Sequence, residues 1–353
     1  MNSPAVALVW PFNAPSNRYI ELHKMLLREI GYEPRALSLW ELLCGGWTQL
    51  LSRRTLVTIH WLEGRPFRST GRGLSLTGVP TVACYVLLML IMPARTAYFI
   101  HNHSVHDATG VWKRLSVGVI ALLARVARVR VVHDPSACDA YAASYLPHPL
   151  YWDAPDARPP VRRSSEPGHL RVTVLGRIRP YKRIDELLEH WPQDMPLLVA
   201  GRCAPDDELQ LRAIIARRGL EPSVRLDCGF VDDEAFSAFL DQTDVLLLPH
   251  APGSMLVSGA FFEAFGRVPL IVARGSPFMR LMAEQHSNVH VYELPQDLAA
   301  LLVAIRQGWM PADADPRAAV ARAQFGWSAC VRAYRGLLGG TPIHAEAEER
   351  GRA

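Results

Sequence analysis

The chain has 353 residues, enough for about two domains of roughly 150 residues, each with its own core. With 49% hydrophobic and 20% charged residues, its composition is that of an ordered globular protein and excludes a disordered or collagen-like chain. The net charge of +4 is unevenly spread, because residues 1–150 hold 15 Lys+Arg against 8 Asp+Glu whereas residues 151–353 hold 23 against 26.

Short runs rich in β-branched residues alternate with segments of helical length in both halves, which predicts βα units and parallel sheets. We therefore expect an α/β protein made of two Rossmann-like domains. The predicted strands, in chain order, are 5–10, 55–61, 96–101, 129–133, 170–176, 196–201, 223–229, 244–249, 269–273 and 288–292.

The domain boundaries follow from composition. We predict a first domain over 1–152, a linker over 153–169 and a second domain over 170–340. The linker is rich in Pro, Arg, Ser and Asp and cannot build a core. Residues 341–353 read as a solvated tail.

Two segments of the basic first half bear on membranes. The apolar run 82–92 lies between Pro80 and Pro93 and is too short to span a bilayer. The stretch 111–132 reads as a basic amphipathic helix, which suits an anionic leaflet; the alternative is a buried helix with a cationic rim. The start of the chain lacks the positively charged region of a signal peptide, so we expect the chain to stay inside the cell.

Several common functions lack their motifs. There is no G-x-G-x-x-G after the first strand and no G-x-x-x-x-G-K-[ST], so dinucleotide and P-loop binding are not predicted. The sequence lacks a stripe of basic residues interleaved with aromatic ones, so nucleic-acid binding is not predicted. The six cysteines form no C-x-x-C pair, and His101, His103 and His106 have no matched carboxylates, so we expect no metal and no cofactor.

One cationic motif stands out in the second half. In GRIRPYKR (176–183), Arg177 follows a predicted strand and Lys182 comes five residues later, where a helix begins. Two cations and backbone N–H groups at one point can bind a diphosphate and stabilise charge on it as it leaves. The alternative is a basic surface cluster.

Together with LLVAGRC, VRLDCGFVDDEAFSAFLDQTDVLLLPH and LVSGAFFEAFGRVPLIV, this motif resembles the nucleotide-sugar domain of GT-B glycosyltransferases over about 100 residues. The resemblance implies that Arg177 and Lys182 hold the diphosphate, that the Ser258-Gly259 backbone approaches it, and that Glu263 binds the ribose. It places the nucleobase of the donor near Phe230 and Val231. The alternative for Glu263 is a charge at a helix N-terminus.

The sequence departs from the common retaining pattern Glu-x7-Glu, since Met255 stands eight residues before Glu263. HWLEG (60–64), HNHSVHD (101–107), GRIRPYKR and the Ser-Gly of LVSGAFF are similar to segments of the xanthan-assembly β-mannosyltransferase group. That resemblance implies an inverting, metal-independent enzyme, peripheral or monotopic at the cytoplasmic face of the inner membrane. It implies GDP-mannose as the donor and a lipid-diphosphate-linked oligosaccharide as the acceptor, in exopolysaccharide assembly.

An inverting transfer needs a general base on the acceptor side. Asp107, preceded by His106, and Glu63 both follow first-domain strands and are the catalytic candidates. Asp107 is preferred, with helix capping as its alternative; Glu63 is alternatively an acceptor contact or a residue that orients a histidine. The candidate acceptor contacts are Asn13, Ser16, Asn17 and His103.

The sequence thus predicts a hexosyltransferase of GT-B fold. Three rivals stay open: a retaining transferase of the same fold, a nucleotide-sugar epimerase of related fold, and a non-catalytic membrane-docked scaffold.

Overall fold

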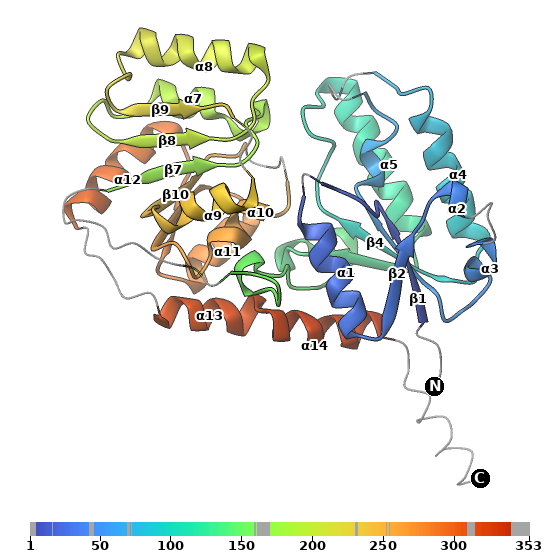
Figure 1. Ribbon diagram of the computed structural model, residues 1–353. Helices are drawn as coiled ribbons and strands as arrows, with labels where there is room; N and C mark the ends of the chain where they lie inside the picture. The colour runs from blue at the N-terminus through green and yellow to red at the C-terminus, as the bar shows by residue number, and fades with distance from the viewer. Residues whose placement is uncertain are drawn as a thin grey trace.

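The computed structural model of the protein describes residues 5–15, 17–41, 46–68, 71, 73–158, 160, 170–229, 232–251, 253, 255–308 and 315–339. Two α/β domains stand side by side, and the last two helices run beneath both of them (Figure 1). Each domain has a six-stranded sheet in which all strand pairs are parallel.

The sheet of the first domain has the order β2-β1-β3-β4-β5-β6. Because β2 lies on one side of β1 and β3 on the other, the strand order reverses at β1. The strands are β1 (Ala5–Trp10), β2 (Tyr32–Ala36), β3 (Leu56–His60), β4 (Arg95–Ile100), β5 (Val129–Val132) and β6 (Ser144–Tyr145).

The sheet of the second domain has the order β12-β11-β10-β7-β8-β9, so its strand order reverses between β7 and β10. Its inner strands are buried, as expected of parallel strands covered by helices on both faces. The strands are β7 (Val172–Leu175), β8 (Leu197–Ala200), β9 (Val224–Asp227), β10 (Val245–Leu248), β11 (Leu270–Arg274) and β12 (Val289–Tyr292).

Helices connect the strands, as parallel pairing requires. The first domain contains α1 (Tyr19–Glu29), α2 (Leu39–Glu41), α3 (Trp47–Leu50), α4 (Gly78–Ile91), α5 (Gly110–Val126) and α6 (Cys138–Tyr141). The second contains α7 (Ile184–Glu189), α8 (Pro205–Arg218), α9 (Asp233–Asp241), α10 (Gly259–Ala264), α11 (Pro277–Gln285) and α12 (Pro295–Gln307), and α13 (Asp315–Phe325) and α14 (Trp327–Leu338) follow.

The ten strands predicted from the sequence are all present, and the α/β fold class is confirmed. Two edge strands, β2 and β6, were missed. β2 contains Pro34 and alternates buried with exposed residues, which is tolerated at a sheet edge but breaks the continuous apolar run that marks a buried strand. β6 has two residues only. The helix predicted over 111–132 is shorter: α5 ends at Val126, and the rest of the segment contains β5.

The packing moves two of the predicted domain boundaries. The side chains of Cys330, Tyr334 and Leu338 on α14 join the core of the first domain, so most of the last helix packs on that domain. Trp327, at its start, also packs against a cluster that contains second-domain residues. Ala154, predicted as linker, is buried in a cluster that combines Tyr19 of α1 with phenylalanines of α10 and α13. Residues 159 and 161–169 of the linker and the tail 341–353 lie outside the described residues.

Candidate active site

The reversal of strand order between β7 and β10 creates a crevice outside the carboxyl ends of these strands, where open α/β sheets bind ligands. β7 leads into Gly176, and a 3₁₀ turn over Pro180–Lys182 follows. β10 leads into His250. The structure therefore brings the predicted diphosphate motif to the sheet edge where the fold predicts a ligand.

Lys182 reaches back into this edge. Its buried Nζ donates to the carbonyl oxygen of Leu175 over 3.0 Å. A side chain at Gly176 would place Cβ 3.3 Å from Nζ, and φ there is +90°, so glycine is required for this approach. Burial lowers the pKa of Lys182 to about 8. Among the described residues, no carboxylate forms an ion pair with Lys182, so an anionic ligand would supply the missing counter-charge.

Arg177 lies on the same loop but at the surface, where its guanidinium is exposed. It acts electrostatically on Tyr181, whose pKa is raised to about 12 by burial and by Asp107 and is held back by Arg179 and Arg177. The two predicted phosphate ligands thus differ: Lys182 is a fixed, buried cation and Arg177 is a solvated one at the rim.

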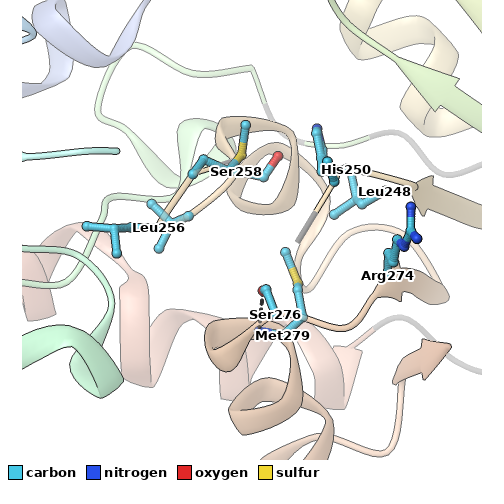
Figure 2. A pocket seen from close by; sticks show the side chains of 10 residues that line it. Leu248, His250, Leu256, Ser258, Arg274, Ser276 and Met279 are labelled. Carbon is cyan, nitrogen blue, oxygen red and sulfur yellow. Dashed lines mark hydrogen bonds between the residues drawn. The ribbon is translucent and has the colours of Figure 1, made fainter. Parts of the chain in front are cut away.

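Figure 2 shows a pocket between β10, β11 and α11 in which His250 and Arg274 border the same space. Burial, followed by the neighbouring Lys182 cation, lowers the pKa of His250 well below its usual range. Arg274 donates to Glu186 over 2.7 Å. The pocket is lined by Leu248, His250, Ala251, Met255, Leu256, Val257, Ser258, Arg274, Ser276 and Met279.

The remaining donor candidates lie on or beside α10. Ser258 is buried at the start of this helix, and a side chain at Gly259 would come 3.3 Å from the hydroxyl oxygen of Tyr151. Glu263 is half-buried and sits in the last turn of α10, so the reading as an N-terminal helix charge is wrong. Phe230 and Val231 lie outside the described residues.

The loop after β4 brings the first domain to the same crevice. The ring of His106 stacks on Tyr181 with centroids 4.5 Å apart. Burial raises the pKa of Asp207, and the carboxylate of Asp107 adds to that rise across the domain boundary. Asp107 has φ +61°, and Thr109 is the N-cap of α5, so Asp107 is not the cap of that helix.

Glu63 occupies a different environment. It is buried, and Tyr98 donates a hydrogen bond of 2.9 Å to its Oε2 atom. Burial raises the pKa of Glu63, while hydrogen bonds from Tyr98 and Asn102 oppose the rise. The structure therefore places Asp107 on a half-buried loop that faces the second domain, and Glu63 in the interior of the first domain.

The proposed acceptor contacts are dispersed. Asn13 is exposed in the loop after β1, and Asn17 accepts a hydrogen bond from the backbone N–H of Tyr19 over 3.1 Å at the start of α1. His103 shares a hydrogen bond of 3.0 Å with the hydroxyl of Tyr141. Ser16 lies outside the described residues. Asn17 thus makes a local hydrogen bond at the start of α1, which is the loop role that was the alternative to acceptor binding.

Sequence reasoning missed the ring pair of Tyr181 and His250 and the cation Arg274. Tyr181 and His250 lie in loops that follow strands of the second sheet, and Arg274 is the last residue of β11. Their position at the carboxyl ends of the strands was the signal that could have identified them. The sequence analysis also missed a cluster of buried histidines in the first domain, called the histidine block below. Five buried histidines surround Tyr19 or its neighbours, namely His23, His60, His101, His133 and His148.

The histidine block is neutral. His60 and His101 share a hydrogen bond of 3.0 Å, and His133 shares one of 2.7 Å with the hydroxyl of Tyr19. Burial lowers the pKa of His23 to about 3 and that of His133 to about 4. In the described part of the chain, no group of three or more His, Cys, Asp or Glu residues is arranged to hold a metal ion.

Two Rossmann-like domains with parallel sheets and a C-terminal helix that returns to the first domain are the features of the GT-B fold. The solved structures support this class. Anabaena HepE, in a complex with UDP and glucose, matches 95% of this chain and 99% of its own with a TM-score of 0.63 and 14% identity.

A Rickettsia africae glycosyltransferase matches 97% of this chain and 100% of its own, with a TM-score of 0.58 and 13% identity. The catalytic domain of Arabidopsis thaliana starch synthase IV, bound to ADP and acarbose, matches 92% of this chain and 78% of its own, with a TM-score of 0.52 and 10% identity. No family model and no curated protein matches the sequence. At these identities the likeness concerns the fold, and the resemblance to the xanthan-assembly group stays a prediction.

Proposed function

We propose that this chain is a glycosyltransferase that moves a hexose from a nucleotide-sugar donor to an acceptor held by the first domain. The observation that carries the proposal is Lys182. A buried ammonium group without an ion-pair partner in the described residues is costly to keep, and it stands at the strand-order reversal where this fold class binds ligands.

In the proposed reaction, Lys182 binds the donor diphosphate inside the crevice and Arg177 binds it from the rim. Both cations stabilise the negative charge that grows on the diphosphate as the bond to the sugar breaks. The Ser258-Gly259 backbone approaches the diphosphate, Glu263 binds the ribose, and Phe230 and Val231 contact the base. No metal ion or other cofactor takes part, because the two cations supply the charge.

The proposed base is Asp107. Its carboxylate takes the proton of an acceptor hydroxyl while that oxygen attacks the anomeric carbon opposite the departing nucleotide, so the configuration is inverted. The side chain at the place of the first acid of the retaining motif is Met255, an apolar lining residue of the pocket. The absence of a carboxylate there favours inversion over retention.

For the donor we propose GDP-mannose, with a UDP-sugar as the alternative. The first follows from the resemblance to the xanthan-assembly group. The second is favoured by Anabaena HepE, whose structures contain UDP, UDP-glucose and glucose. A thermal-shift panel of GDP, UDP, ADP and TDP separates them, because a ligand present at 100 times its Kd stabilises the fold by about 2.7 kcal/mol.

For the acceptor we propose a lipid-diphosphate-linked oligosaccharide at the cytoplasmic face of the inner membrane, in exopolysaccharide assembly. Support comes from α4 and α5, which lie next to each other in Figure 1. They carry exposed apolar side chains, and Lys113, Arg114 and Arg125 are exposed on α5. Apolar residues beside cations suit an anionic leaflet. In the described residues, every helix is too short or too polar to cross a bilayer.

The test is sugar transfer from radiolabelled GDP-mannose and UDP-glucose to a membrane extract that contains lipid-linked saccharides, followed by analysis of the anomeric configuration. An inverted product supports the proposal, and a retained one favours the retaining alternative. Nucleotide binding without transfer or donor turnover identifies a scaffold. Turnover of the donor without an acceptor identifies an epimerase.

A further inference from the structure

Three aromatic rings form a column across the crevice. The ring of His106, from the loop after β4, stacks on Tyr181 with centroids 4.5 Å apart and an interplanar angle of 17°. Tyr181 in turn faces His250, which follows β10, at 5.9 Å and 15°. The column therefore joins the loop that carries Asp107 to the turn that carries Lys182.

The chain on both sides of the Tyr181 ring packs against other segments. The N–H of Ala251 donates to the carbonyl oxygen of Tyr181 over 2.8 Å, which ties the 3₁₀ turn to the loop after β10. On the other side, a Cβ atom at Gly71 would lie 2.8 Å from the carbonyl oxygen of His106, so the His106 loop is backed by the chain at Gly71. The ring of Tyr181 thus lies between two rings, His106 and His250, whose loops are each packed against another part of the chain.

A second contact joins the two domains near the loop that carries His106. The N–H of Leu256, a residue of the pocket wall, donates to the carbonyl oxygen of His101 over 3.2 Å, so the two domains also meet at the start of the same loop. The buried Nδ1 atom of His106 has no hydrogen-bond partner in the described part of the chain. Stacking, rather than a hydrogen bond at this atom, holds the imidazole.

We infer that Tyr181 is a positioning residue for the proposed transfer: its ring, clamped between His106 and His250, sets the place of Asp107 relative to a diphosphate bound by the adjacent Lys182. This inference rests on the proposed function. The physical reason is that the base and the donor sit on different domains, and misplacing the base by about 1 Å is enough to lower a rate by about 100-fold. Tyr181 and Lys182 are neighbours in one short turn, so donor and base share a common support.

The experiment compares Tyr181→Ala with Tyr181→Phe. The first removes the stacked ring, and the second keeps the ring and removes only the hydroxyl. We expect Tyr181→Ala to lower kcat at saturating donor and acceptor by about tenfold or more. The Kd of the nucleoside diphosphate, measured by calorimetry without acceptor, should change less than about threefold because the Lys182 cation remains. Tyr181→Phe should keep kcat within about twofold of the wild type.

His286→Ala is the matched control, because His286 packs edge-on against Phe265 with centroids 4.8 Å apart, away from the residues of the column. It should lower thermal stability without lowering kcat. A double-mutant cycle of His106→Ala and Tyr181→Ala completes the test. The fold-loss of kcat in the double variant should be smaller than the product of the fold-losses in the two single variants.

The outcomes separate the inference from the function on which it rests. An active wild type whose kcat is unchanged in Tyr181→Ala overturns the inference alone. A loss of nucleotide affinity equal to the loss of kcat also overturns it, because Tyr181 would then be a donor contact. A wild type that transfers no sugar overturns the proposed function and the inference with it.

Discussion

The two domains differ in charge where they face each other. The wall from the second domain holds positive charge, with Lys182 buried and Arg177 exposed beside it. The wall from the first domain is backed by a block of neutral histidines, of which His60 and His101 bond to each other. The difference suggests a division of labour in which the second domain binds an anion and the first domain supplies the base.

The largest expected effect tests the first-domain wall. Asp107→Asn should lower kcat by about 100-fold to 10,000-fold, the usual range for loss of a general base, while donor affinity stays normal. Glu63→Gln should mainly raise the acceptor KM. Initial rates and donor affinities of both variants check this. If Asp107→Asn stays active and Glu63→Gln is inactive with normal donor affinity, Glu63 is the general base and Asp107 is not.

The second-largest effect tests the opposite wall. Lys182→Ala and Arg177→Ala should each cost about 1.5–3 kcal/mol of transition-state stabilisation, or about 10-fold to 150-fold in kcat/KM, because each removes a charge-assisted contact to the leaving diphosphate. We expect the buried Lys182 to show the larger loss. Arg212→Ala, which removes an exposed cation paired with Glu208, is the control. Unchanged kinetics in both site variants would remove the basis for a diphosphate site here.

A third prediction concerns the histidine block. Its imidazoles are neutral in the fold and titrate near 6.5 when unfolded, so the unfolded state binds more protons below that pH and stability falls as pH falls. Each such histidine should cost about 1 kcal/mol between pH 7.5 and 5.5. Urea unfolding at both pH values measures this. His23→Gln should flatten the pH dependence, whereas replacing the exposed His190 should leave it unchanged.

The smallest expected effect concerns the membrane side of the first domain. Replacing Arg114 and Arg125 with Glu should weaken sedimentation with anionic vesicles by about 1 kcal/mol per cation removed, and salt should weaken the wild type in the same direction. These two are better targets than Arg128, which donates to the carbonyl oxygens of Met92 and Pro93 at the end of α4. Equal recovery of wild type in the supernatant with and without vesicles would refute the docking face.

The sequence was sufficient for what depends on local pattern. Short runs rich in β-branched and apolar residues marked ten of the twelve strands in the described residues, because parallel strands covered by helices need apolar residues at many positions. The order of those runs identified two Rossmann-like domains, and the position of Lys182 after a strand placed it at the ligand-binding edge. The membrane role, the donor and the acceptor stay predictions.

The tertiary structure decided what depends on distant residues. Tyr181 and His106 are 75 positions apart and Tyr334 joins the first domain from the end of the chain, so neither contact leaves a local pattern. Asp107 and Glu63 looked alike as acids after strands, yet one faces the other domain and the other is buried against Tyr98. Burial and partnership are set by how the two domains pack, which is why the same residue type has different chemistry at the two positions.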